Sequence, residues 1–354
     1  MLKTLGIMRN FIKIGNRKIG ENYPPFVVAE IGINHEGNLS KAKRMIKDAA
    51  RVGVECVKFQ THIVSDEMVP IAKKIIPGHT TDSIWNIMER CAFSEKQDRE
   101  LKKYTESLGL LYLSTPFSRA GADRLNRMKV KAFKIGSGEC NNYPLVEHVT
   151  RFGKPIILST GMNNISSIKK AVAIFHKHKV PYALMNCTSM YPTPYSHIHL
   201  GAISDLRKHF PDAVLGQSDH SIGNYTCFAA VALGASILEK HFTSDKKWHG
   251  PDIPISIDPG ELKSLIIGST AVWQALGGAK SILKEEQDII NFAYACVVST
   301  KLIVKGQKFS KENIWVKRPG TGEIKAIEYP KIINKKASRN IPANIQLKRS
   351  DILK

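Results

Sequence analysis

Eight short apolar runs alternate with helix-like segments along the first two thirds of the chain, and this rhythm limits the folds open to it. Each run has strand length and is apolar nearly throughout, which is typical of parallel strands covered on both faces. The segment 39–53 shows the helical pattern, with Ser40 as the expected N-terminal cap and Gly53 as the stop. The runs span residues 26–32, 56–62, 110–116, 132–138, 155–161, 182–188, 214–220 and 237–243.

Eight strand–helix units predict closure into a (β/α)₈ barrel, with an open doubly wound sheet as the alternative. No G-x-G-x-x-G or P-loop motif follows any of the runs, which disfavours the open sheet. After residue 280 the sequence changes to short strands and turns. We therefore expect a barrel domain over 1–281, a linker over 282–294 and a small β-rich domain over 295–354.

The chain is strongly basic, with a net charge of +21 from 52 Lys plus Arg against 31 Asp plus Glu. Such an excess suits nucleic acid, an anionic membrane surface or an anionic substrate. The basic residues stand singly or in pairs along the whole chain, a distribution that disfavours a nucleic-acid site and favours a lysine-rich solvated surface. Six scattered cysteines without a C-x-x-C pair favour free thiols, and no signal-peptide pattern is present. We expect a cytoplasmic protein.

Polar residues end nearly all of the eight runs. In a (β/α)₈ barrel the carboxyl ends of the strands carry the reactive groups, so these residues are candidates for a site. Lysines and small hydroxyls dominate, and together they suit a phosphate or carboxylate. The expected anion-binding residues are Lys58, Thr115, Lys134, Ser137, Ser159 and Ser218.

His220 and His241 end two adjacent predicted strands and are therefore expected to face a common volume. Neutral imidazoles bind Mn²⁺, Fe²⁺, Co²⁺ or Zn²⁺. Two histidines beside Glu30 and water would form an open, catalytic type of metal site. Hydrogen-bonded core histidines or a general base are the alternatives, and the spacing alone does not choose between them.

Eleven sequence blocks, in order and over nearly the full length, resemble the sialic acid synthase (N-acetylneuraminate synthase) family. Each block alone is a weak signal, whereas the ordered set is specific. They are AEIGINHEG (29–37), VKFQTHIVSDEM (57–68), IMERCA (87–92), STPFSRAGADRL (114–125), FKIGSGECNNYPL (133–145), PIILSTGM (155–162), YPTPY (191–195), GQSDHS (216–221), LEKHFT (238–243), GPD (250–252) and NIWVKRPG (313–320).

The resemblance implies a barrel followed by a small antifreeze-like (SAF, β-clip) domain, in a homodimer whose small domains reach over the partner's active site. It implies a metal-dependent condensation of phosphoenolpyruvate with an N-acetylated amino sugar, releasing phosphate by C–O cleavage. The resemblance assigns the divalent ion, usually Mn²⁺ with Mg²⁺ or Co²⁺ as alternatives, to His220 and His241. It assigns the binding of phosphoenolpyruvate to the six anion-binding residues. The catalytic residues become Glu30, Lys58 and Lys134, and the sugar-binding residues become Gln60, Glu139, Tyr191, Asp252 and Arg318.

Departures from the family pattern lie on the sugar side, at Phe59 in KFQTH, at Ser189-Met190 and around Trp248. The retained GSGECNNYP block favours N-acetylmannosamine as the acceptor and N-acetylneuraminic acid as the product. A diacetamido-trideoxyhexose that yields legionaminic acid, or less readily pseudaminic acid, is an alternative, and so is N-acetylmannosamine 6-phosphate.

Two rival functions are another phosphoenolpyruvate-condensing barrel, which makes octulosonate or heptulosonate phosphates, and a non-catalytic carbohydrate-binding protein. The trailing domain with Arg318 argues against the first.

Overall fold

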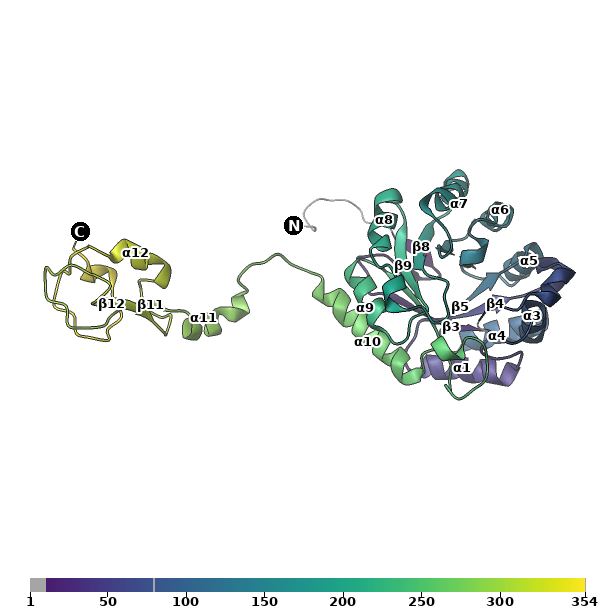
Figure 1. Ribbon diagram of the computed structural model, residues 1–354, viewed down its shortest axis with the longest axis horizontal. Helices are drawn as coiled ribbons and strands as arrows, with labels where there is room; N and C mark the ends of the chain where they lie inside the picture. Colours follow the sequence, from purple (N-terminus) through teal and green to yellow (C-terminus); the bar gives the residue numbers. More distant parts are fainter. Residues whose placement is uncertain (1–10, 79, 354) are drawn as a thin grey trace. The chain divides into compact units, whose positions relative to one another are not determined.

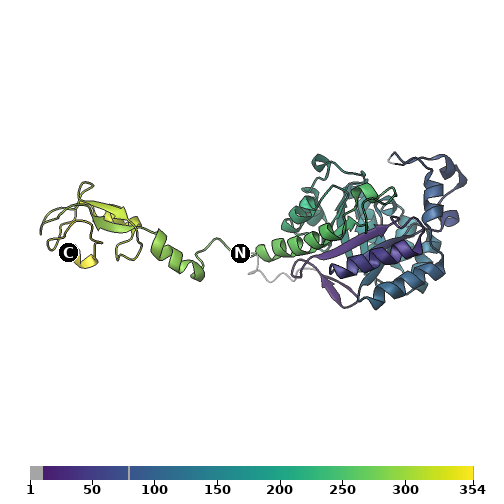
Figure 2. The same cartoon turned by 90° about the horizontal axis from the view of Figure 1, so that it is seen from below.

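Eight parallel strands form the centre of the first of two compact units in the computed structural model, which describes residues 11–78 and 80–353. The strand order is β5-β4-β3-β10-β9-β8-β7-β6, and β5 lies beside β6, so the sheet closes into a ring. Helices surround it (Figures 1 and 2), which confirms the predicted (β/α)₈ barrel. The strands are β3 (Phe26–Gly32), β4 (Cys56–Thr61), β5 (Leu111–Pro116), β6 (Phe133–Ile135), β7 (Ile156–Ser159), β8 (Tyr182–Cys187), β9 (Val214–Asp219) and β10 (Ile237–His241).

The helices of this unit begin at side-chain caps in most cases. Asn38 caps the first one by accepting a hydrogen bond from the backbone N–H of Lys41, so the prediction of Ser40 as the cap was wrong. Ser94 caps α4 in a reciprocal capping box with Gln97. The α-helices are α1 (Leu39–Arg51), α2 (Val64–Glu67), α3 (Ile84–Cys91), α4 (Glu95–Ser107), α5 (Arg119–Arg127), α6 (Tyr143–Thr150), α7 (Ile165–Lys177), α8 (Ala202–His209), α9 (Tyr225–Ala232) and α10 (Pro259–Ala275), and the 3₁₀ helices are η1 (Pro70–Lys74), η2 (Ser137–Glu139), η3 (Tyr195–His197) and η4 (Ile253–Ile255).

Alternate residues of each strand enter two different cores. One set, such as Val27, Val57 and Leu238, packs between the strands and the helices. The other set fills the amino end of the barrel interior together with residues of the hairpin β1 (Ile12–Ile14) and β2 (Arg17–Ile19). We call the alternate strand positions that face the barrel interior positions of interior parity. Because apolar side chains occupy the amino end of the interior, polar side chains of this parity can gather only at the carboxyl ends of the strands. The interior set includes Ile12, Ile14, Ile19, Phe26, Val28, Cys56, Leu113, Ala132, Ile157, Ala183, Met185, Val214 and Ile237.

The second compact unit begins at Gly278 and has its own apolar cluster, centred on side chains such as Val297, Phe309 and Ile341. Its two strands pair antiparallel. The residues that we expected to be a linker, 282–294, include two helical segments and belong to this unit. The elements are η5 (Lys284–Glu286), α11 (Gln287–Ala293), β11 (Cys296–Ser299), β12 (Ile314–Lys317), η6 (Ala326–Glu328), α12 (Tyr329–Ile332) and η7 (Arg349–Asp351).

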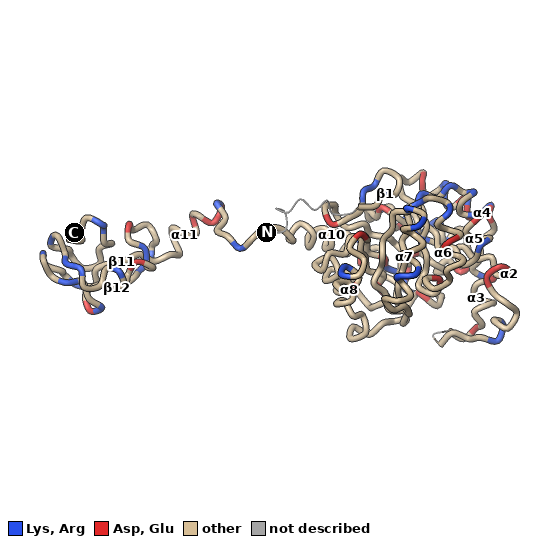
Figure 3. Tube along the Cα trace, turned by 90° about the horizontal axis from the view of Figure 1, so that it is seen from above, with Lys and Arg blue, Asp and Glu red and all other residues tan. Residues whose placement is uncertain are grey.

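Lysine and arginine are spread along both units rather than gathered on one element (Figure 3), as the sequence predicts. All six cysteines are buried and free. Within residues 11–78 and 80–353, no helix combines the length and the apolar character needed to cross a membrane.

A fully buried ion pair joins β9 and β10 on the face of the sheet that carries the helices. Lys240 Nζ lies 2.9 Å from Asp219 Oδ2 and also donates to the carbonyl of Ser221. Thr226 Oγ1 donates to the same carboxylate oxygen at 2.6 Å, and the Ser221 N–H donates to the other. Burial would raise the pKa of Asp219, but the Lys240 ammonium and the hydrogen bonds from Thr226 and Ser221 together hold it below its usual range.

Removing one partner of this pair should destabilise the barrel strongly. We expect Asp219→Ala to lower the free energy of unfolding by about 3–5 kcal/mol, because it leaves the Lys240 ammonium buried without a counter-charge. Urea unfolding followed by tryptophan fluorescence measures the change. The double variant Asp219→Leu/Lys240→Met is the control and should recover most of the loss, and a single variant as stable as the wild type would contradict the prediction.

Candidate active site

The predicted site residues share the strand parity of the apolar barrel interior. Glu30 stands two residues beyond Val28, and Lys58 two residues beyond Cys56. Since alternate residues of a strand face the same side, continuing the interior positions toward the carboxyl ends puts a polar group on almost every strand. These groups are Glu30, Lys58, Gln60, Thr115, Lys134, Ser159, Cys187, Ser218, His220, Glu239 and His241.

Two lysines and two carboxylates form a buried charge cluster at this level. Lys58 Nζ lies 2.8 Å from Glu30 Oε2 and 3.5 Å from Glu239 Oε1, and Lys134 Nζ lies 3.2 Å from the same Glu239 oxygen. All four side chains are at most 8% exposed. The charges balance within the cluster, which is the condition for keeping ionised groups inside a barrel.

The pKa values in the cluster follow from burial and from these contacts. Burial raises the pKa of Glu30 more than the Lys58 ammonium lowers it. Burial would also raise the pKa of Glu239, but Lys134 and Lys58 together lower it. Burial lowers the pKa of Lys134, whereas Glu239 and Glu30 outweigh burial and raise the pKa of Lys58. Glu30 is therefore the carboxylate in the cluster that takes up a proton most readily.

Hydroxyl groups surround the two lysines. Lys58 Nζ donates to Thr115 Oγ1 at 3.2 Å, and Lys134 Nζ donates to Ser159 Oγ at 2.8 Å. Ser218 Oγ donates to Glu239 Oε1 at 3.3 Å. Ser137, in η2, accepts a hydrogen bond from the Gly161 N–H at 3.0 Å. A Cβ at position 161 would lie 2.9 Å from Ser137 Oγ and 2.5 Å from Ser189 Oγ, so glycine is needed there to let these hydroxyls approach.

The two predicted metal ligands come together at one side of this cluster. The rings of His220 and His241 have centroids 5.3 Å apart, and Tyr191 stacks on the His220 ring at 4.2 Å. His220 Nδ1 lies 2.8 Å from the carbonyl oxygen of Thr188, a hydrogen-bond acceptor. In the neutral ring the proton therefore sits on Nδ1 and Nε2 carries the lone pair. Burial lowers the pKa of His220, but contacts with the Cys187 thiol and the Thr188 carbonyl raise it overall.

The second histidine is buried and close to a carboxylate. His241 Nδ1 has no hydrogen-bond partner within the described residues and lies 3.5 Å from Asp252 Oδ2. Burial lowers the pKa of His241, which keeps the ring neutral. Burial, with a smaller contribution from Glu30, raises the pKa of Asp252 to about 7.

Four of the five expected sugar-binding residues belong to the barrel unit, and the fifth, Arg318, belongs to the second unit. Gln60 Nε2 donates to Glu30 Oε1 at 3.3 Å, and Tyr191 and Asp252 flank the histidines. Glu139 is half-buried in η2, where the Asn142 amide donates to it at 2.7 Å. Arg318 belongs to the second unit, where its side chain is exposed and its guanidinium lies 6.0 Å from the Phe292 ring centroid.

Two further residues of the site had no role in our sequence-based prediction. Glu239 lies between both lysines and is needed for charge balance. Cys187 contacts His220 and Ser137 with its thiol. Both stand at positions of interior parity near a strand end, so strand parity was the signal that could have identified them.

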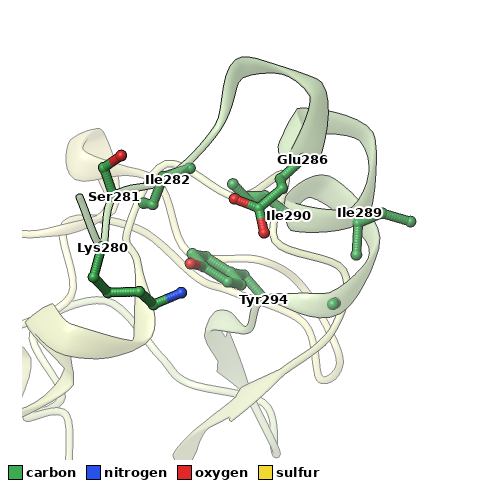
Figure 4. Close-up of a pocket in the computed structure, with 8 residues that line it drawn as sticks. Lys280, Ser281, Ile282, Glu286, Ile289, Ile290 and Tyr294 are labelled. Carbon is green, nitrogen blue, oxygen red and sulfur yellow. The ribbon is translucent and has the colours of Figure 1, made fainter. Parts of the chain in front are cut away.

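Two pockets among the described residues lie away from this cluster. One of about 360 Å³ is in the second unit, where Tyr294 and Glu286 lie along its wall (Figure 4). Another, of about 340 Å³, includes Tyr182 at the first residue of β8, away from the carboxyl ends. The case for the active site therefore rests on the convergence of charged and histidine side chains at the strand ends rather than on cavity volume.

Comparison with known proteins identifies the family to which the chain belongs. The NeuB family profile matches residues 45–281, and the SAF domain profile matches residues 294–353. The chain belongs to the NeuB family. This NeuB-family chain is therefore an enzyme of the nonulosonic acid synthase type, as the sequence resemblance predicts.

Two curated relatives and one solved structure illustrate the breadth of the match. The N,N'-diacetyllegionaminic acid synthase of Campylobacter jejuni is 37% identical over 89% of this chain and 96% of its own. The N-acetylneuraminate-9-phosphate synthase of Homo sapiens is 34% identical over 90% of this chain and 89% of its own. The crystal structure of N-acetylneuraminic acid synthetase from Leptospira borgpetersenii, in complex with citrate, has a TM-score of 0.74 at 34% identity, covering 80% of this chain and 96% of its own.

NeuB-family enzymes are typically metal-dependent, and the rings of His220 and His241 lie close enough together to be candidate ligands. His220 Nδ1 contacts the Thr188 carbonyl, whereas the buried His241 Nδ1 has no hydrogen-bond partner in the described residues and lies 3.5 Å from Asp252 Oδ2. Fixing the outer nitrogen of a ligating histidine is the usual way in which a protein orients a metal ligand. Among residues 11–78 and 80–353, no cluster of three or more His, Cys, Asp or Glu side chains is arranged to hold a metal.

Replacing one histidine should weaken the binding of Mn²⁺ directly. We expect His241→Gln to raise the dissociation constant of Mn²⁺ by at least about 100-fold, beyond the 10–100-fold typical of losing an outer-shell partner. Electron paramagnetic resonance of free Mn²⁺ measures this without any turnover. His148→Gln, which changes a histidine paired with Asp123 outside the site, is the control. Equal Mn²⁺ binding by the two variants would refute the assignment.

Proposed function

We propose that this enzyme condenses phosphoenolpyruvate with the open-chain aldehyde of N-acetylmannosamine and water, giving N-acetylneuraminic acid and phosphate. The observation that carries the proposal is the buried cluster of Lys58, Lys134, Glu30 and Glu239 beside the pair His220 and His241. An anionic co-substrate and a polarised carbonyl need these two features side by side.

Phosphoenolpyruvate is proposed to bind among the lysines and hydroxyls. The ammonium groups of Lys58 and Lys134 neutralise its phosphate and carboxylate, and the hydroxyls of Thr115, Ser159 and Ser218 orient the oxygens. The incoming anion adds negative charge to a cluster that is already balanced. Burial raises the pKa of Glu30, and the added negative charge acts in the same direction, so this carboxylate is suited to take a proton from water in the chemical step.

The proposed chemistry forms one carbon–carbon bond and breaks one carbon–oxygen bond. Carbon 3 of phosphoenolpyruvate attacks the aldehyde carbon, and the aldehyde oxygen takes up a proton and becomes a hydroxyl group. Water forms a new bond to the cationic carbon 2 and gives one proton to Glu30, and the remaining hydroxyl proton leaves with the phosphate when the adduct collapses. The tetrahedral adduct then collapses to a 2-keto acid, and the departing phosphate leaves with charge stabilisation from Lys58 and Lys134. His220 and His241 would hold a divalent ion, and its Lewis acidity would polarise the aldehyde oxygen.

The acceptor sugar is proposed to lie beside Gln60, Glu139, Tyr191 and Asp252. Retention of the GSGECNNYP block supports N-acetylmannosamine. The 37% identity to the Campylobacter jejuni enzyme favours a second candidate, a diacetamido-trideoxyhexose that yields diacetyllegionaminic acid. The 34% identity to the human enzyme brings in N-acetylmannosamine 6-phosphate as a third.

A homodimer completes the proposal. Arg318 of each small domain would contact the N-acetyl group of a sugar bound in the partner's barrel, as the family resemblance implies. The exposed guanidinium of Arg318, carried by a compact unit of its own, is compatible with such a contact.

Phosphate release identifies the acceptor. With Mn²⁺ and phosphoenolpyruvate, we expect N-acetylmannosamine to give the highest kcat/KM, at least about tenfold above its 6-phosphate and the diacetamido-trideoxy sugars, a difference of roughly 1.4 kcal/mol in transition-state binding. Mass spectrometry of the product provides the check. A higher kcat/KM with either alternative would replace N-acetylmannosamine, and no release with any acceptor would refute the function.

Lys134 should be needed for turnover more than for folding. We expect Lys134→Met to lower kcat by about 10²–10³-fold, because the departing phosphate loses one of its two buried cations. Steady-state phosphate release measures the effect. Lys103→Met, at an exposed position on α4, is the matched control and should stay within about twofold of the wild type. A Lys134→Met enzyme with normal kcat would remove Lys134 from the mechanism.

A further inference from the structure

A line of hydrogen bonds runs outward from the charge cluster to the segment after β4. Gln60 Nε2 donates to Glu30 Oε1 at 3.3 Å. Gln60 Oε1 lies 2.9 Å from His62 Nε2, and His62 Nδ1 lies 2.8 Å from Glu67 Oε2 in α2. The three contacts connect the interior of the barrel to a helix outside it, through one amide and one imidazole.

The imidazole in this line is held rigidly. His62 is buried, and its ring stacks on Phe117 with centroids 4.6 Å apart and planes 16° from parallel. The short helix that carries Glu67 is itself fixed, because Asp66 Oδ2 accepts a hydrogen bond from the Ala120 N–H at 2.8 Å. Figure 3 shows α2 at the edge of the barrel, beside α3. The ring therefore cannot turn away from Gln60 without losing the stack and both hydrogen bonds.

Counting protons fixes the direction of the hydrogen bonds. An amide oxygen only accepts, so His62 Nε2 must carry a proton and donate it to Gln60 Oε1. His62 Nδ1 then faces a carboxylate, and one further proton is shared between Nδ1 and Glu67 Oε2. With its oxygen held by His62, the Gln60 amide can only turn its NH₂ group toward Glu30. A flipped amide would bring its oxygen against the Glu30 carboxylate.

We propose that His62 and Glu67 are positioning residues that aim the Gln60 NH₂ group at Glu30 and at the acceptor sugar. The inference rests on the proposed function, in which Gln60 lies on the sugar side of the site. It makes acceptor recognition depend on α2, which lies outside the barrel. In the described residues, His62 and Glu67 form no hydrogen bond or ion pair with the lysines proposed to bind phosphoenolpyruvate, so their effect should fall on one substrate only.

Steady-state kinetics with both substrates varied tests this asymmetry. His62→Phe keeps an aromatic ring on Phe117 but removes both hydrogen bonds. We expect a rise of roughly tenfold in the KM of the sugar, the scale of one lost polar contact, with the KM of phosphoenolpyruvate within about twofold of the wild type. The unchanged KM for phosphoenolpyruvate also shows that the barrel is folded. Equal rises in both KM values would overturn the proposal.

A double-mutant cycle tests whether His62 acts through Gln60. If it does, the double variant His62→Phe/Gln60→Ala should have the same KM for the sugar as Gln60→Ala alone, because the amide that His62 orients is already absent. Fully additive losses would show that His62 acts independently. Glu67→Gln should retain the KM of the sugar, since its amide can donate to Nδ1 while Nε2 keeps its proton. Glu67→Ala should raise that KM by about threefold.

A spectroscopic measurement separates this inference from the proposed function. In ¹⁵N-histidine-labelled enzyme, with the His62 signals identified by their loss in His62→Phe, we expect Nε2 to be protonated in the wild type and in Glu67→Gln. An unprotonated Nε2 would overturn the positioning role even in an active enzyme. A protonated Nε2 in an enzyme that releases no phosphate with any acceptor would uphold the geometry and refute the proposed function instead.

Discussion

The structure depends on keeping two buried lysines charged inside a barrel. Lys58 and Lys134 are almost fully buried, and neither would remain an ammonium there without Glu30 and Glu239 within 2.8–3.5 Å. The requirement constrains the strands that carry them. β3, β4, β6 and β10 must bring their carboxyl ends to one level, and a closed ring of parallel strands achieves this.

Strand parity explains how much of the site could be predicted from sequence. In every strand except β8, which ends with Cys187, the interior position is apolar near the amino end and polar near the carboxyl end, as in Val28 followed by Glu30 and Ile237 followed by Glu239. The eight runs could be read as strands because both faces are buried, and their last residues could be read as a site because barrels place function there. Glu30, Lys58 and Lys134 are brought together on this basis.

Contacts across strands could not be predicted in the same way. The role of Glu239 depends on register, which places it beside Ser218 on one side and Val28 on the other, within reach of two lysines from other strands. Register is not visible in a single strand. The cap of α1 was mistaken for a similar reason, since Asn38 and Ser40 both suit the role and only the backbone at Asn38 is extended there. Local sequence patterns indicate the role for which each residue is suited. The side chains that it contacts depend on the register of the strands in the closed barrel.

The same alternation gives consecutive residues different roles at the ends of β9 and β10, where one residue forms an ion pair and the next is a histidine of the site. Asp219 and Lys240 point to the helix-covered face and pair with each other, whereas the residues that follow them, His220 and His241, point into the barrel. A fully buried ion pair is costly to break, so it fixes β9 against β10 immediately before both metal-ligand candidates. The distance between the two imidazoles is thus set by Asp219 and Lys240, which lie on the helix-covered face of the sheet and not in the site. The ion pair therefore stabilises the geometry of the site without occupying the space for substrate.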